Sequence, residues 1–117
     1  MSRLGFWVSP EFCAEQLISL MDSSRLIEHL IQENSSDKAA WKSKLMLTLC
    51  EYYSCISQQI ALISDIVLQE PEHNEDTGKE EFFVSEKEAA IMTSLLSLMT
   101  ITRNELEHKH RLSLTVH

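Results

Sequence analysis

The chain has 117 residues, of which 44% are hydrophobic and 24% charged, and its formal net charge is −8. This length allows one domain with a modest core, and the composition argues against wholesale disorder. A net-acidic chain lacks the cationic surface that neutralises phosphates, so we expect no nucleic-acid partner and no binding to an anionic membrane surface. Only two glycines and two prolines occur, fewer than sheet proteins usually need for their turns, so we expect long helices.

The first expected element is a helical segment over about residues 10–34. Ser9-Pro10-Glu11 is typical of a helix start, because it combines a capping hydroxyl, a first-turn proline and an acid that suits the helix dipole. Apolar residues then recur at helical spacing as far as Ile31. The run Asp22-Ser23-Ser24 favours a break or kink within the segment, although neither residue type forbids a continuous helix.

The clearest pattern predicts a long central helix over residues 37–69. Asn34-Ser35-Ser36-Asp37 separates it from the first segment, and Pro71 ends it. Seven apolar residues of this helix, the central stripe, recur at alternating steps of three and four. They are Met46, Leu49, Tyr53, Ile56, Ile60, Ile63 and Val67. A second apolar row beside them makes the stripe wider than one helix pair requires, so we expect it to bind a partner as well as its own chain.

An acidic loop and a last helix follow. Residues 70–88 carry eight acidic and two basic side chains, a net charge of −6, and we expect residues 70–84 to be a flexible loop. Ser85 and Glu88 have the spacing of a capping box, which predicts a helix over residues 85–111. Met92 and Met99 in this helix offer an adaptable binding groove, with ordinary core packing as the alternative. Residues 112–117 alternate in polarity but form too short a run to predict a strand, so we expect a tail.

Two Glu-x-x-His pairs raise the hypothesis of a two-metal bundle enzyme, because such bundles hold iron or manganese with this motif. The pairs are Glu70…His73 and Glu105…His108. The first contains Pro71 and lies beyond the expected helix end, and the second lies in a charged region with no carboxylate in the apolar stripes. We therefore expect no catalytic residue, no metal site and no cofactor.

The three cysteines, Cys13, Cys50 and Cys55, cannot all pair with one another. No histidine lies close to them in the sequence, so we expect buried structural thiols rather than nucleophiles. The sequence has no signal-peptide core, and no apolar run approaches the roughly 20 residues needed to span a bilayer. These features predict an intracellular protein in the cytoplasm or the nucleus.

Together, the patterns predict a single all-α domain over residues 1–117. Its expected architecture is an elongated three- or four-helix bundle with one long central helix and an acidic loop before the last helix. The expected function is a non-enzymatic interaction, scaffold or adaptor module that self-associates, for example as a dimer, or docks onto the helices of a partner protein. The central stripe, Met92 and Met99 are the residues expected to bind the partner. Two alternatives stay open: an excised segment of an α-solenoid scaffold, and the metal-binding bundle enzyme.

Overall fold

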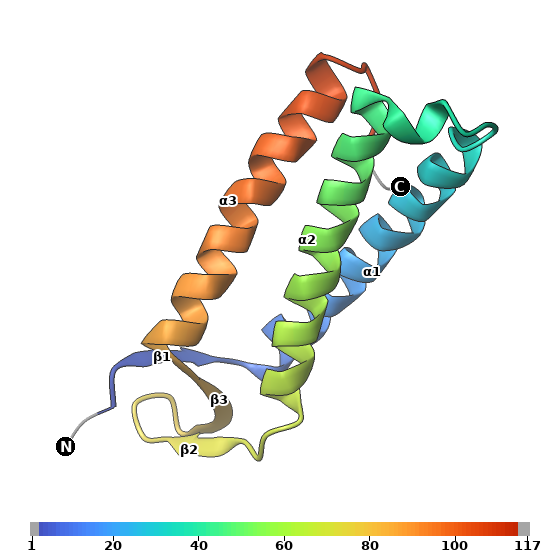
Figure 1. Cartoon of the computed structure of the whole chain (residues 1–117). Helices are drawn as coiled ribbons and strands as arrows, with labels where there is room; N and C mark the ends of the chain where they lie inside the picture. Colours follow the sequence, from blue (N-terminus) through green and yellow to red (C-terminus); the bar gives the residue numbers. More distant parts are fainter. Residues whose placement is uncertain (1–2, 115–117) are drawn as a thin grey trace.

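The computed structural model describes residues 3–114, which form three helices and a small antiparallel sheet (Figure 1). The expectation of an all-α bundle is therefore wrong, because the protein has a mixed α/β fold. In chain order the elements are β1 (Gly5–Val8), α1 (Pro10–Glu33), the short 3-10 helix η1 (Ala40–Lys42), α2 (Lys44–Val67), β2 (Glu72–Asn74), β3 (Lys79–Ser85) and α3 (Glu86–His108).

The sheet joins segments that lie far apart in the sequence. Strand β3 is central, with β1 on one side and β2 on the other, and both pairings are antiparallel. Residues 5–8 of β1 lie opposite residues 82–85 of β3. An ideal Cβ on Gly5 would overlap the Val84 carbonyl oxygen, so only glycine fits this position without a shift of the backbone.

The segment expected to be a flexible loop, residues 70–84, is instead the β2–β3 hairpin. Its turn is closed by the Gly78 N–H, which donates to the Asn74 carbonyl at 2.8 Å, and Gly78 has the left-handed φ of 71°. Phe82 and Val84 alternate into the core, while the acidic residues of the hairpin are mostly exposed. Burial of Phe82 and Val84 therefore keeps this segment ordered, although its charge favours disorder.

Helix α1 is continuous, so the expected break at residues 22–24 does not occur. Ser9 caps it as predicted, because its Oγ accepts a hydrogen bond from the Phe12 N–H at 3.0 Å. Leu20 and Ile27, on either side of the polar run, are both buried in the core. Because the same face of the helix is buried before and after this run, the helix continues through Asp22, Ser23 and Ser24, which are weak helix formers.

Helix α2 is shorter than expected, while the start of α3 agrees with the predicted capping box. Asp37 lies before η1, where its carboxylate accepts from the Ala40 N–H at 2.8 Å, and α2 begins after Ser43, whose Oγ accepts from the Met46 N–H at 3.1 Å. At the start of α3, the Ser85 Oγ accepts from the Glu88 N–H at 3.2 Å, and the Glu88 carboxylate accepts from the Ser85 N–H at 3.3 Å.

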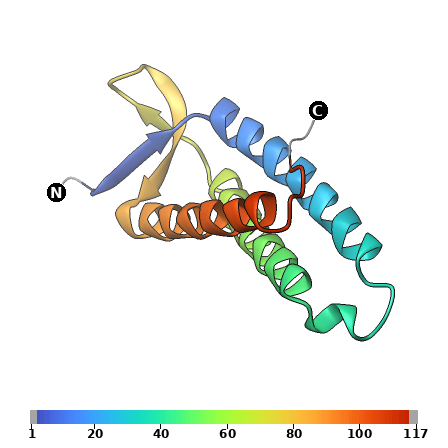
Figure 2. The same cartoon turned by 90° about the horizontal axis from the view of Figure 1, so that it is seen from above.

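Helix α2 is the centre of the molecule. Both α1 and α3 pack along it but barely contact each other, and α3 diverges from α1 in the view from above (Figure 2). The sheet closes one end of an elongated molecule of 55 × 26 × 22 Å. After α3 the chain turns back, with the Leu112 N–H donating to the Leu106 carbonyl at 3.1 Å, and buries Leu114. This arrangement leaves much of α3 without a covering element.

Candidate functional site

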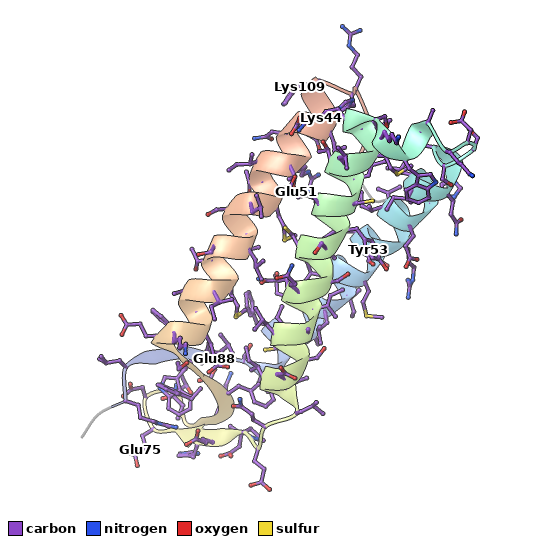
Figure 3. The ribbon with its side chains drawn as sticks, viewed as in Figure 1. Lys44, Glu51, Tyr53, Glu75, Glu88 and Lys109 are labelled. Carbon is purple, nitrogen blue, oxygen red and sulfur yellow. The ribbon has the colours of Figure 1, made fainter. Side chains whose placement is uncertain are left out.

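The central stripe of α2 serves mostly as the chain's own core. Its most buried residues are at most 3% exposed: Met46, Leu49, Ile56 and Ile63. The other three, Tyr53, Ile60 and Val67, are half-buried against the same core. The Tyr53 hydroxyl donates to a carboxylate oxygen of Glu28 at 2.7 Å, on the side of α2 that faces α1 (Figure 3). Little of this stripe is therefore accessible to a partner.

Helix α3 carries an uncharged surface with several exposed apolar side chains. Residues 89–102 include no charged side chain, whereas the outer face of a surface helix is usually charged. Of the 23 residues in α3, only Thr102 and Leu106 are buried. Its large apolar side chains are exposed to 44%, 46%, 37% and 63% at Ile91, Leu96, Leu98 and Ile101 respectively. Such surface is common at interaction sites and uncommon elsewhere on monomers.

One side of α3 borders an apolar groove, which we name the α3 groove. It has a volume of about 220 Å³ beside the sheet and has no charged lining residue. The lining side chains that we use below are Phe6, Phe12, Met92 and Leu96. A second hollow, which shares Leu96 and includes Met99, extends the groove along α2 and α3. Met92 and Met99 thus border one groove while packing partly against the core, and their role in binding stays a prediction.

Polar residues of both α2 and α3 border the α3 groove. Tyr52 lines the second hollow together with Arg103, and burial raises the pKa of the Tyr52 hydroxyl. Gln59 lies on α2 between Tyr52 and Ile63, which line the two parts of the groove, and is 3% exposed. Its side-chain oxygen accepts no hydrogen bond from residues 3–114. Arg103 is a charged residue of the second hollow, whereas the part of the groove beside the sheet has no charged lining residue and is suited to apolar contacts.

The opposite side of α3 carries a regular row, which we name the outer seam. It consists of residues at steps of four and three: Lys87, Ile91, Ser94, Leu98, Ile101 and Glu105. The first five are exposed, and the Glu105 side chain is partly exposed. The sequence reasoning missed this row because it followed the residues that point to the core. The uncharged run over residues 89–102 is the signal that would have found it.

Charge is separated along the molecule. The stretch of net charge −6, residues 70–88, lies at the sheet end, where Figure 3 labels Glu75 and Glu88. Lys44 and Lys109 are labelled at the opposite end, and their ammonium groups lie 3.7 and 3.9 Å from a carboxylate oxygen of Glu105. Helix α3 therefore runs from an acidic end to a basic end.

The cysteines have two environments. Cys13 and Cys55 are buried, and burial raises the pKa of both thiols, which lowers their reactivity. Cys50 is exposed on α2, contrary to the expectation that all three are buried. All three are free thiols.

The Glu-x-x-His pairs are not brought together as a metal site in the part of the chain that the structure describes. Within residues 3–114, no cluster of three or more His, Cys, Asp or Glu side chains is arranged to hold a metal ion. The His73 ring of the first Glu-x-x-His pair contacts Glu80 of β3, with 3.0 Å between the His73 Nδ1 and a carboxylate oxygen. In the same described range, no helix has the length and apolar character that a membrane crossing requires. Comparison with protein-family models, with curated proteins and with solved structures gives no match.

Proposed function

We propose that this protein is a non-enzymatic interaction module that binds protein helices through α3. The helices belong to a second copy of the chain or to a partner protein. The observation that carries the proposal is the uncharged run over residues 89–102, which leaves apolar side chains exposed on both sides of the contact with α2. Burial of such surface is the main source of favourable free energy in protein association.

A helix suits this surface better than a small molecule does. Ligand pockets usually enclose their ligand and present a few convergent polar groups. The α3 groove has an almost entirely apolar lining beside the sheet, where its volume is about 220 Å³. It extends along the helices, and flexible methionine side chains line both parts, as in surfaces that accept amphipathic helices.

No feature of residues 3–114 favours the two alternatives. An α-solenoid stacks similar helix pairs, whereas here a sheet closes one end and α1 barely contacts α3. A metal enzyme needs carboxylates aimed into the core, whereas the buried polar residues of the described chain are Thr48, Gln59, Asn74 and Thr102. The three free cysteines support the proposed location in a reducing, intracellular compartment.

Light scattering across a hundredfold concentration range, combined with binding of the dye ANS, tests the proposal. We expect the mass to rise with concentration or the monomer to bind the dye, because α3 must be either covered or exposed. Leu96→Glu should reduce dye binding, whereas Leu47→Glu, at an exposed leucine of α2 outside the groove, should not. A strict monomer that binds no dye would contradict the proposal.

A further inference from the structure

The spacing of the residues in the outer seam is the same from either end of the helix. Its six residues, 87, 91, 94, 98, 101 and 105, step by four, three, four, three and four. Two such helices placed antiparallel, with their centre between Ser94 and Leu98, bring chemically complementary residues together. Lys87 faces Glu105 of the second copy, and Ile91 faces Ile101 of the second copy. Ser94, which is small, faces Leu98 of the second copy.

We infer that the outer seam docks a second copy of this chain, with the two α3 helices antiparallel about a two-fold axis. The inference rests on the proposed function and names the occupant of one face of α3. A two-fold axis makes the contact isologous and closed, so every pairing occurs twice. Four exposed isoleucines, Ile91 and Ile101 from each copy, become covered in the contact.

The charges select both the second copy and its direction. A parallel arrangement would place Lys87 against Lys87 and Glu105 against Glu105, and like charges at an interface are unfavourable. The antiparallel arrangement turns both contacts into ion pairs, in which Lys87 of the second copy joins Lys44 and Lys109 around the Glu105 carboxylate. It also sets the acidic end of each molecule, residues 70–88, beside the basic end of the other. A partner of different sequence would match this seam only if it carried charged and apolar residues at the same spacing and in the same order.

The expected dimer is weak. Residues 87–105 span about 27 Å at 1.5 Å per residue, and one helix pair of this length falls near the lower limit of roughly 1,200 Å² for stable interfaces. We expect a dissociation constant on the order of 10 µM, in the range of weak transient complexes. The α3 groove lies on the other side of the helix, so the dimer leaves two grooves free.

Analytical ultracentrifugation between about 1 and 100 µM tests the inference, because this range brackets the expected dissociation constant. The wild type should shift from monomer to dimer, and Ile101→Asp should stay monomeric. Ile18→Asp on α1 is a matched control, since Ile18 is 62% exposed and Ile101 is 63% exposed. It should dimerise like the wild type. Ile91→Asp provides a second seam variant should Ile101→Asp unfold, which circular dichroism detects.

Charge reversal tests the direction. Lys87→Glu should weaken dimerisation by about tenfold, because the new carboxylate faces Glu105 of the second copy, and adding Glu105→Gln should recover part of the loss. Glutamine is used because lysine at this position would lie beside Lys44 and Lys109 of its own chain. A double variant no tighter than Lys87→Glu alone would overturn the antiparallel arrangement. A chain that is monomeric throughout but binds ANS overturns the inference and leaves the proposed function intact. A monomer without dye binding overturns both, and a dimer unaffected by both isoleucine variants overturns the assignment to the seam.

Discussion

Replacing Ile56 by alanine tests whether the central stripe is the core of a single chain. Ile56 is 0% exposed and lies in the middle of α2, in the core cluster that also takes in residues of α1 and α3. Removing three carbons costs about 2.4 kcal/mol in transfer free energy at roughly 0.8 kcal/mol per methylene. The cavity left behind adds to this cost, so the free energy of unfolding should fall by about 3–4 kcal/mol. A domain of this size has about 5–15 kcal/mol, so the variant should still fold.

Urea unfolding followed by far-UV circular dichroism measures this loss. The protein concentration should be about 1 µM, where the chain is expected to be monomeric. Ile18→Ala is the control, because Ile18 is an exposed residue of α1, and its effect should stay within about 0.5 kcal/mol. A loss at Ile56 below about 1 kcal/mol would refute the packing of α2 between α1 and α3.

Three further predictions concern the sheet and the cysteines. Gly5→Ala should lower the melting temperature in a thermal scan, because its Cβ would overlap the Val84 carbonyl; an unchanged melting temperature would contradict the β1–β3 register. Cys50 should react with iodoacetamide before the two buried cysteines, as mass spectrometry of the digest can show; faster labelling of a buried one would contradict the described core. The hydrogen bonds from Arg3 lower the pKa of Glu72, so this pair stabilises the fold above the ordinary glutamate pKa of about 4.3 and ceases to do so as the pH falls through the lowered value. Glu72→Gln should therefore melt below the wild type at neutral pH and level with it in acid, and a difference that persists in acid would assign the effect to packing.

The helices were predictable because their signals are local. Ser9 and Ser85 have hydroxyls that cap the backbone within three residues, and both caps form as the sequence suggested. The apolar stripe of α2 likewise repeats within a single element. The predicted kink at residues 22–24 was wrong, because that reading used local propensity while burial of both flanking turns decides the outcome.

The sheet was not predictable from the same reasoning. Strand β1 has only four residues, Gly5–Val8, and its partner strand lies far along the chain, so no local pattern links the two. The net charge of the hairpin region argued for a mobile loop. The alternation of buried Phe82 and Val84 with half-buried Phe83 was the available sign of a strand, and Gly78 was the available sign of its turn.

The interaction surface was predictable in part. Met92 and Met99 lie along one groove, and their role in binding stays a prediction. The stripe on α2 pointed instead to the element that organises the core, because periodicity shows which residues share a face and not what covers that face. The uncharged run over residues 89–102 was the available sign of the exposed apolar side of α3, but which side lies uncovered follows from the packing of α1 and α3 on α2.

The pairing of β1 with β3 also fixes the order in which the chain can fold. During synthesis β1 leaves the ribosome first, but it can pair only after residues 82–85 have emerged. The contact between α1 and α2 forms from neighbouring segments and needs no such delay. Phe6 and Trp7 therefore remain without their partner strand while α1 and α2 pack together, and the sheet forms late in folding. Slowing translation after residue 70 should lengthen that interval and raise the demand for chaperones.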